Sequence, residues 1–432
     1  MEIFEVLVLV ISFLVLLSLG VPISFSIGIS SLFTMMLSIN TLPSLTTVSQ
    51  RMATGIDSFA LLAIPFFILA GQLMNSGGIA RRLIDFAKVL VGKLPGGLAF
   101  VNILAAMLFG AISGSAVAAA SAIGGFMTPV MEKEGYDKSF SAAVNISSST
   151  TGLIIPPSNI LIVYSLASGG VSIAALFLAG YIPGILLGLS LMVVAYIHAK
   201  KNNYQVNFEF KLSDAIKKFF DAVPSLLLII IVIGGIVAGY FTATEASAVA
   251  VLYAFILSVF FYKEVKIKDL PDILLSSAST TAIVMLLVGT SMAMSWVMAY
   301  ENIPQNVAQA LLALSDNKII ILIIINIILL FIGTFMDMTP AVLIFTPIFL
   351  PVAIQLGIDP IHFGIIMVMN LSVGLCTPPV GSVLFVGCSV ADLPITKVIK
   401  PLIPMFLAMV VALLLVTYIE EITLIVPQLF GY

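Results

Sequence analysis

Apolar runs long enough to cross a lipid bilayer recur along the whole sequence. Examples are residues 225–240, 319–333 and 401–418, and a membrane-spanning helix needs about 20 predominantly apolar residues. Charged residues make up 9% of the chain and hydrophobic residues 61%, whereas soluble domains have about 25% charged residues. The sequence therefore predicts an all-α polytopic membrane protein with about ten spans and two additional hairpins.

The first apolar run, residues 3–19, resembles a secretory signal peptide only in its hydrophobicity. It has no basic segment before it, and it continues through residues 20–22 into a second apolar stretch, so we expect it to be retained as a span. The two cysteines, Cys376 and Cys388, have no CxxC spacing, which favours neither a disulfide framework nor a zinc site. No basic stripe predicts a nucleic-acid partner.

The basic residues predict how the chain is oriented in the membrane. Sixteen of the eighteen Lys and Arg residues fall on one side, and only Arg51 and Lys318 on the other, if residues 94–131 and 318–356 form re-entrant hairpins. A single crossing at either place would move every later lysine loop to the opposite side. Because basic residues mark the cytoplasmic side, the pattern predicts two hairpins and places both termini outside, toward a periplasm-like space.

The two halves of the sequence resemble each other. Residues 110–115, GAISGS, correspond to residues 333–338, GTFMDM, 223 positions later. A second landmark agrees, because a Pro-Pro pair begins at Pro156 and another at Pro378, 222 positions apart. Since an odd number of crossings separates the two hairpins, the repeat is predicted to be inverted in the membrane.

This repeat divides the chain into three parts. Residues 1–200 form the first inverted repeat, residues 201–221 a cytoplasmic amphipathic connection, and residues 222–432 the second repeat. Each repeat is expected to hold fixed helices, one hairpin and one broken helix. Two amphipathic stretches with basic faces, Ile79–Val91 and residues 212–220, are suited to the inner interface and are candidate arms that link a moving body to a fixed one.

The Pro-Pro pairs predict two discontinuous helices. Each pair removes two backbone donors and disfavours helix in the residue before it. Non-helical backbone at membrane depth has to be buried in protein or line a cavity. Two broken helices and two hairpin tips at matching positions therefore indicate a substrate site near the bilayer midplane, as in secondary transporters.

Hydroxyl groups before the first break suggest an ion. Residues 147–151, SSSTT, include Ser149 and lead into the segment that ends at Ser158 and Asn159. Unwound carbonyls, hydroxyls and the negative ends of half-helices form an oxygen-rich environment that suits sodium. The alternative is that these hydroxyls only satisfy freed carbonyls and allow close helix packing.

The two hairpin tips carry the other candidate side chains. Asp337 is the only carboxylate at a tip, and intramembrane acids are functional by default, although Asp337 or Thr339 could instead cap a helix that has Pro340 at its start. At the first tip, Ser113 and Ser115 flank Gly114, where hydroxyls and helix N-terminal amides can receive a carboxylate. Small residues there could also serve packing alone.

These motifs resemble those of the large membrane subunit of tripartite ATP-independent periplasmic (TRAP) transporters, over nearly the whole length of the chain. The resemblance rests on residues 110–115, 151–159, 242–247, 333–340 and 377–382. It implies an elevator-type ion-transporter fold and mechanism, in which hairpins and broken helices carry substrate with at least two sodium ions. It also implies a separate small membrane subunit and a soluble periplasmic substrate-binding protein as partners.

By the same resemblance, site residues can be assigned one by one. The implied substrate contacts are Ser113, Ser115 and Asp337, with Thr339 and Ser158 as further candidates. Sodium is expected at Ser113, Gly114, Ser149, Asn159, Gly333, Asp337, Met338 and Thr377.

The substrate implied is an organic acid that bears a carboxylate, and sialic acid is favoured over C4-dicarboxylates. No membrane arginine is available as a carboxylate clamp, so hydroxyls, amides and sodium have to bind the acid. The main alternative is a sodium/dicarboxylate symporter of related architecture that needs no binding protein. Neither paired carboxylates nor a Ser/His constellation indicates an intramembrane enzyme, and a purely structural subunit would leave the matched breaks unexplained.

Overall fold

The computed structural model describes residues 2–202, 204, 212–315, 317–378 and 380–432, and all the elements in these ranges are helices. The first half contains α1 (Glu2–Ser18), α2 (Ile23–Ser38), α3 (Thr41–Gly55), η1 (Phe59–Leu62), α4 (Ala63–Ser76), α5 (Ile79–Val91), α6 (Gly97–Ser113), α7 (Ala116–Lys133), α8 (Lys138–Ser149), η2 (Thr150–Leu153), α9 (Asn159–Ala167) and α10 (Ile173–Lys201).

The second half repeats this order with a few changes. It contains α11 (Leu212–Val237), α12 (Ala243–Phe255), the π-helical turn η3 (Ile256–Phe261), η4 (Ile267–Asp269), α13 (Leu270–Tyr300), α14 (Ile303–Leu314), α15 (Lys318–Phe335), α16 (Met338–Gln355), α17 (Pro360–Gly374), α18 (Ser382–Val390), α19 (Ile395–Tyr418) and α20 (Glu421–Leu429).

Helix lengths agree with a membrane protein. Within the described ranges, eight helices are long and apolar enough to cross a bilayer, including both arms of the second hairpin, α15 and α16. Four further apolar helices are shorter, among them α6 of the first hairpin. The prediction of an all-α polytopic membrane protein with two hairpins is confirmed.

The repeat predicted from two motifs extends over many elements. Helices α14–α19 begin 221 to 224 positions after α5–α10. The smallest offset is between α6, which begins at residue 97, and α15, which begins at residue 318. The largest is between α5, which begins at residue 79, and α14, which begins at residue 303. The matched pairs include the hairpin arms and both halves of each broken helix. The fold is therefore an inverted repeat of the elevator-transporter type, as the sequence predicts.

Both broken helices break where the proline pairs predict. Helix α8 ends at Ser149, a 3-10 turn reaches Leu153, and helix resumes only at Asn159. In the second repeat α17 ends at Gly374 and α18 begins at Ser382. Pro379, the second proline of the later pair, lies outside the described residues.

Two pairs of glycines fix the hairpin tips against these breaks. A Cβ placed on Gly110 of α6 would lie 2.4 Å from the Cα of Gly152, and in the second repeat a Cβ on Gly374 would lie 2.6 Å from the Cα of Gly333 in α15. No side chain fits at such distances. Backbone therefore touches backbone at both tips, and the Gly381 amide also donates to the Thr334 carbonyl oxygen at 3.0 Å.

The two repeats interlock to form one body. Helix α18 of the second repeat packs on α8 of the first, where the Cys376 thiol donates to the Ile146 carbonyl oxygen at 3.4 Å. Helix α9 packs on α16 and α17, and the buried Tyr164 hydroxyl donates to the Pro360 carbonyl oxygen at 2.6 Å. Each broken helix therefore lies against elements of the other repeat.

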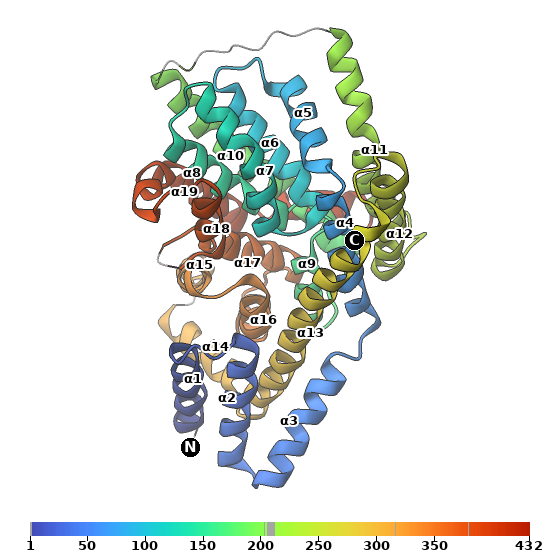
Figure 1. Cartoon of the computed structure of the whole chain (residues 1–432). Helices are drawn as coiled ribbons and strands as arrows, with labels where there is room; N and C mark the ends of the chain where they lie inside the picture. Colours follow the sequence, from blue (N-terminus) through green and yellow to red (C-terminus); the bar gives the residue numbers. More distant parts are fainter. Residues whose placement is uncertain (1, 203, 205–211, 316, 379) are drawn as a thin grey trace.

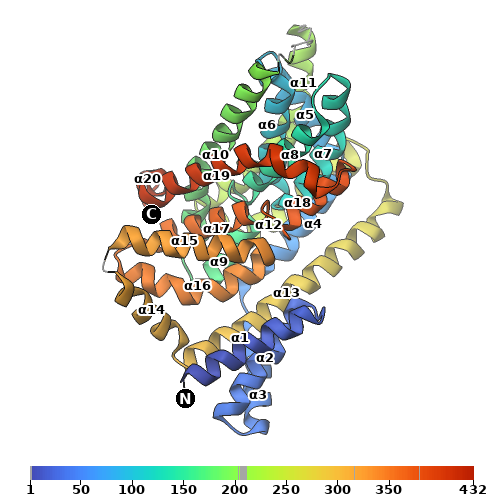
Figure 2. The same cartoon turned by 90° about the vertical axis from the view of Figure 1, so that its left-hand side faces the viewer.

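A second group of helices lies beside this body. Helices α2 and α3 pack on the long helix α13 and α1 packs on α2, on the opposite side of the molecule from α6–α8 (Figures 1 and 2). Helix α4 packs on α12 and α13, and α12 packs on α11. We refer to α1–α4 and α11–α13 as the scaffold, and to α6–α10 with α15–α20 as the body.

One helix in each repeat links the scaffold to the body. Helix α5 contacts α11 of the scaffold and α6 of the body, and α14 contacts α13 and α16 in the same way. The first arm was expected at Ile79–Val91, which is α5. The second was expected at residues 212–220, but those residues form the first turns of the 26-residue helix α11, so the equivalent of α5 is α14.

We predict that Gly110→Ala and Gly152→Ala each destabilise the folded protein by about 1–3 kcal/mol, because the added methyl group overlaps backbone that cannot rotate away. Thermal unfolding of purified protein in detergent measures the effect. Gly125→Ala in α7 is the matched control, since nothing lies within 4 Å of a Cβ at that position. It should be neutral or slightly stabilising. Equal melting temperatures for all three variants would contradict the close packing.

Candidate functional site

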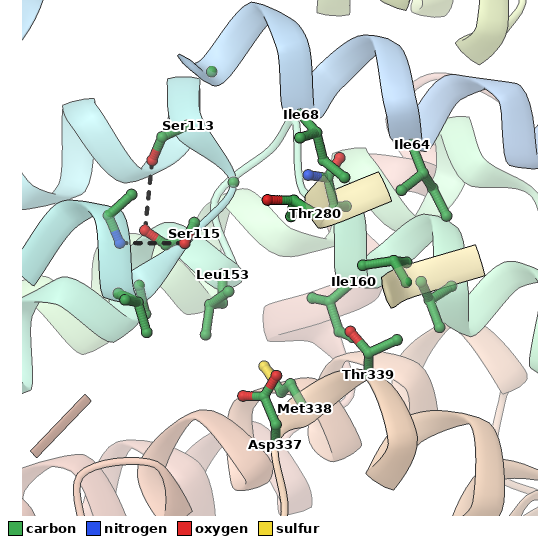
Figure 3. Close-up of a pocket in the computed structure, with 18 of the residues that line it drawn as sticks. Ile64, Ile68, Ser113, Ser115, Leu153, Ile160, Thr280, Asp337, Met338 and Thr339 are labelled. Carbon is green, nitrogen blue, oxygen red and sulfur yellow. Dashed lines mark hydrogen bonds between the residues drawn. The ribbon is translucent and has the colours of Figure 1, made fainter. Parts of the chain in front are cut away.

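A cavity of ≈ 250 Å³ lies where the hairpin tips, the broken helices and the scaffold meet (Figure 3). The first hairpin contributes residues 113–118 and the second Asp337, Met338 and Thr339. The broken helices contribute Leu153, Asn159, Ile160, Val163 and Leu375, and the scaffold contributes Ile64, Ile68, Gly71, Gln72 and Asn75 from α4 and Thr280 and Val284 from α13.

Three helix N-termini open onto this cavity. Helix α7 begins at Ala116, α9 at Asn159 and α16 at Met338, and all three residues line the cavity. The first turn of a helix has backbone N–H groups without helical partners, and the helix dipole places partial positive charge there. Since α9 and α16 have no side-chain cap, the arrangement suits a bound carboxylate.

The first tip is built by Ser113, Gly114 and Ser115. Gly114 has a φ of 61° and ends α6, so the chain reverses there without a Cβ penalty. The Ser115 hydroxyl oxygen accepts from the Ala118 amide at 3.2 Å, and the Ser113 hydroxyl donates weakly to the Ser115 carbonyl oxygen at 3.5 Å (Figure 3). Ser115 therefore caps α7 and lines the cavity at the same time.

Asp337 lies across the cavity from this tip (Figure 3). It occupies the N-cap position of α16, but its side chain makes no capping hydrogen bond, and Thr339 is inside the helix. The carboxylate is solvent-accessible because it faces the cavity. The carboxylate interacts with the Met338 amide and the Ser382 hydroxyl, and it lines the cavity, where a ligand can reach it.

The charge balance of the cavity is one-sided. Among its lining residues in the described ranges, Asp337 alone carries a formal charge, and Arg, Lys and His are absent. Unit charges of like sign 4 Å apart repel by about 4 kcal/mol at an effective dielectric constant of 20. An acid bound beside an ionised Asp337 would therefore meet repulsion, which an accompanying cation or proton would remove.

Seven of the predicted site residues line this cavity: Ser113, Gly114, Ser115, Asn159, Asp337, Met338 and Thr339. They come from three separate parts of the sequence and are brought together by the packing of both hairpin tips on the broken helices. These seven of the eleven predicted site residues therefore share one cavity.

The other four predicted residues lie outside the cavity lining. The hydroxyls of Ser149, Ser158 and Thr377 donate to backbone carbonyl oxygens of Asn145, Leu153 and Val373, at 2.6, 2.6 and 3.0 Å. Gly333 packs on Gly374. These side chains satisfy the backbone near the breaks, so an ion at those positions would need the remaining oxygen lone pairs or backbone carbonyls.

The sequence analysis did not identify the scaffold wall of the cavity. Gln72 and Asn75 on α4 and Thr280 on α13 are polar and line the cavity from the scaffold. Gln72 and Asn75 are three positions apart, which places them on one face of a helix. That spacing inside an apolar span was the available signal, although it did not reveal which helices the face would meet.

Comparisons with known proteins agree with this architecture. Residues 10–422 match the family described as "Tripartite ATP-independent periplasmic transporter, DctM component". The crystal structure of the Alcanivorax borkumensis YdaH transporter is similar with a TM-score of 0.66 and 14% identity, covering 92% of this chain and 90% of that one. At that identity the likeness shows the fold alone.

Three relatives are similar over nearly their whole length. The uncharacterized protein YgiK of Salmonella typhimurium is 57% identical, covering 99% of this chain and 98% of its own. The C4-dicarboxylate TRAP transporter large permease protein DctM of Rhodobacter capsulatus is 40% identical, with 95% and 96% covered. The sialic acid TRAP transporter large permease protein SiaM of Vibrio cholerae is 40% identical, with 96% and 97% covered.

The cavity can be tested by cysteine labelling. We predict that Gln72→Cys and Thr280→Cys react with a membrane-impermeant methanethiosulfonate reagent in detergent, because both positions line the cavity. The background should be low since Cys376 and Cys388 are buried. Ser158→Cys is the matched control and should stay unlabelled, because Ser158 is buried and bonded to Leu153. Labelling of Ser158→Cys at the same rate as Thr280→Cys would contradict the described cavity.

Proposed function

The chain belongs to the tripartite ATP-independent periplasmic transporter family as its DctM component, and we propose that it imports an organic acid by sodium symport. The observation that carries the proposal is the composition of the cavity. Three helix N-termini attract an anion, while a lone carboxylate, Asp337, requires that a cation accompany it.

Sodium is the cation that fits the available ligands. The tips and breaks offer hydroxyl, amide and carbonyl oxygens together with one carboxylate, and thiolate or imidazole ligands are absent from the cavity lining in the described ranges. Hard monovalent cations prefer such oxygen donors, and discontinuous helices supply them in other secondary transporters. At least two ions per cycle are proposed, one at each tip.

An elevator movement follows from how the cavity is divided. One wall belongs to the body and the other, with Gln72, Asn75 and Thr280, belongs to the scaffold. In the described part of the chain, the arms α5 and α14 link the two groups, which also meet where α13 packs on α16 and α4 packs on α6. Sliding the body along the scaffold would carry the substrate and its ions across while the tips and breaks keep their internal contacts.

The substrate is proposed to be a carboxylate-bearing organic acid, with sialic acid as the first candidate. The two relatives named for sialic acid and for C4-dicarboxylates are each 40% identical to this chain, so overall similarity does not choose between them. The cavity favours the class because its anion-attracting groups are backbone amides and hydroxyls, which recognise a carboxylate whatever the rest of the molecule.

The partners are proposed from the family. A tripartite transporter would combine this large permease with a small membrane subunit and a periplasmic substrate-binding protein, and the bacterial inner membrane is the proposed location. The alternative is a symporter that binds its acid directly from solution. The two differ in whether transport needs the soluble protein.

We predict that proteoliposomes with this chain and its small subunit take up labelled sialic acid only when an inward sodium gradient and the binding protein are both present. The binding protein is the one encoded beside this permease, and a labelled C4-dicarboxylate is assayed in parallel. Uptake without the soluble protein would support the alternative symporter. Uptake that is equal with sodium and with potassium would contradict sodium coupling.

We predict that Asp337→Asn raises the sodium concentration for half-maximal uptake by about tenfold, because a charge-assisted contact of roughly 1.5 kcal/mol or more is lost. Asp57→Asn is the matched control, since Asp57 is exposed in the loop between α3 and η1, away from the cavity. An unchanged sodium dependence in Asp337→Asn, with normal folding, would remove Asp337 from the ion site.

A further inference from the structure

A second, charged cavity of ≈ 210 Å³ lies between the arm α5 and the hairpin helix α7. One face of α5 contributes Arg81, Ile84, Asp85 and Lys88, and α7 contributes Phe126, Met127 and Val130. The α5 residues follow the i, i+3, i+4, i+7 spacing of a single helical face. This cavity is separate from the candidate transport site, with which it shares no lining residue.

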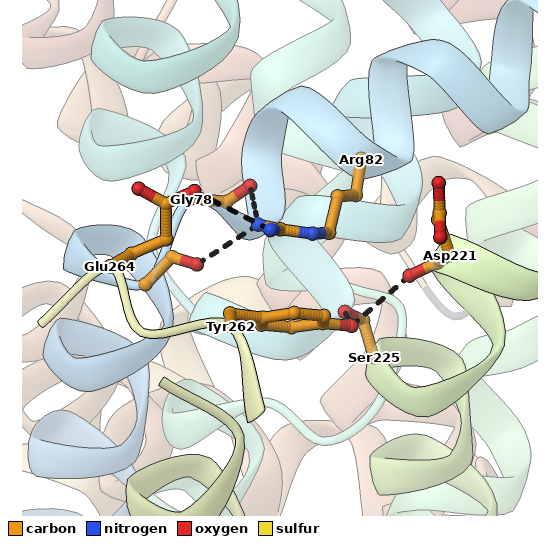
Figure 4. A network of polar contacts seen from close by, with 7 residues as sticks. Gly78, Arg82, Asp221, Ser225, Tyr262 and Glu264 are labelled. Carbon is orange, nitrogen blue, oxygen red and sulfur yellow. Dashed lines mark hydrogen bonds and ion pairs between the residues drawn. The ribbon is translucent and has the colours of Figure 1, made fainter. Parts of the chain in front are cut away.

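The orientation of α5 is set by its neighbouring arginine, Arg82 (Figure 4). The Arg82 guanidinium lies 3.7 Å from the centre of the Tyr262 ring and donates to the carbonyl oxygens of Gly77 and Gly78 at 3.3 and 3.0 Å. It also pairs with Glu264 at 3.4 Å. These contacts tie the start of α5 to the segment that follows η3, while Arg81 and Lys88 line the cavity beside α7.

Positive charge in the cavity is not balanced by the protein. Asp85 pairs with Lys218 of α11 at 3.4 Å, which offsets the one acidic group in the lining. For Arg81 and Lys88, the part of the chain that the structure describes provides no ion-pair partner. Two cationic side chains, about 10 Å apart along the helix axis, therefore face the cavity, and the one carboxylate in its lining, Asp85, is shared with Lys218.

The distance of the cavity from the hairpin tip corresponds to the depth of lipid headgroups when the tip is at the bilayer midplane, as the sequence predicts. Phe126 and Val130 are 11 and 15 residues beyond the tip residue Ser115 on the same hairpin, which corresponds to roughly 16 and 22 Å along a helix. The hydrocarbon half-thickness of a bilayer is about 15 Å. With the tip near the bilayer centre, Arg81 and Lys88 lie at the boundary between acyl chains and headgroups.

Apolar side chains are exposed on α7 and α5, which line the cavity, and on α11, which packs on α5. Phe126 is 51% exposed on α7, Leu90 is 55% exposed on α5, and Phe220 is 65% exposed on α11. Together with the two cations, they provide what an anionic phospholipid needs, because acyl chains can lie on the aromatic and aliphatic groups while the phosphate meets Arg81 and Lys88.

The second repeat shows that the fold itself does not require these charges. The equivalent arm α14, with the sequence IPQNVAQALLAL, has no ionisable side chain. It packs on α16, the counterpart of α7, and buries Pro304, Ala308 and Leu311. An arm can therefore be attached to a hairpin by apolar packing alone, so the charges of α5 call for another explanation.

We infer that the cavity between α5 and α7 binds the headgroup of an anionic phospholipid from the cytoplasmic leaflet. The lipid phosphate bridges Arg81 and Lys88 while its chains cover Phe126, so that the lipid fills the gap between the arm and the hairpin. This inference rests on the membrane location of the chain and not on the proposed substrate or ion. Its failure would leave the proposed transport function unaffected.

The test is lipid binding by the full chain with its small subunit, purified in detergent and measured by native mass spectrometry and thermal shift. Phosphatidylglycerol is compared with phosphatidylcholine of the same chain length. Wild-type protein should retain phosphatidylglycerol preferentially and melt at a higher temperature with it. Arg81→Gln with Lys88→Gln should lose about tenfold or more of that preference, whereas Arg81→Lys with Lys88→Arg should keep most of it.

The matched control is Lys200→Gln with Lys201→Gln, which removes two exposed positive charges at the end of α10. Its lipid preference should equal that of wild type. An equal loss in this control would show diffuse electrostatics and overturn the site. A thermal shift with inorganic phosphate or glycerol phosphate at millimolar concentration, matching that of the lipid, would show a soluble anion site and also overturn the inference.

Discussion

The contact of backbone with backbone at two glycine pairs is the constraint on which the rest of the structure depends. Gly110 meets Gly152, and Gly333 meets Gly374, at distances that exclude any side chain. Each contact presses a hairpin tip onto the break of a helix. Because non-helical backbone at membrane depth has to be covered by protein or line a cavity, this packing both permits the breaks and brings the tips together around one cavity.

The cavity combines two electrostatic features with opposite effects on an anion. The N-termini of α7, α9 and α16 favour an anion, while Asp337 opposes one. A site of this kind is most favourable when acid and cation are both present, which is the requirement for coupled transport. Since the scaffold supplies the opposite wall, the occupied body can leave that wall without dismantling its own ligand contacts.

Much of this arrangement could be predicted from the sequence, because proline pairs and glycines determine the local backbone. The 222-position repeat then relates these local features in the two halves of the chain. Ser113, Ser115 and Asp337, which the sequence predicts as site residues, line one cavity for that reason. Gln72 and Thr280 were missed because their position depends on which helix faces meet, a property of tertiary packing. The second arm was predicted at the amphipathic residues 212–220. The helix that corresponds to α5 in the repeat is α14, which has no charged residue and resembles α5 only in its place in the repeat.

The proposed elevator mechanism requires the body to move as a unit relative to the scaffold. A distance measured between the body and the scaffold tests this movement. Spin labels are placed at Val193 on α10 and Leu275 on α13, both exposed, with Val193 and Phe385 on α18 as a pair within the body. On addition of sodium, substrate and binding protein, the first distance should shift and the second should stay constant. A constant distance for both pairs, in protein that transports, would contradict movement of the body relative to the scaffold.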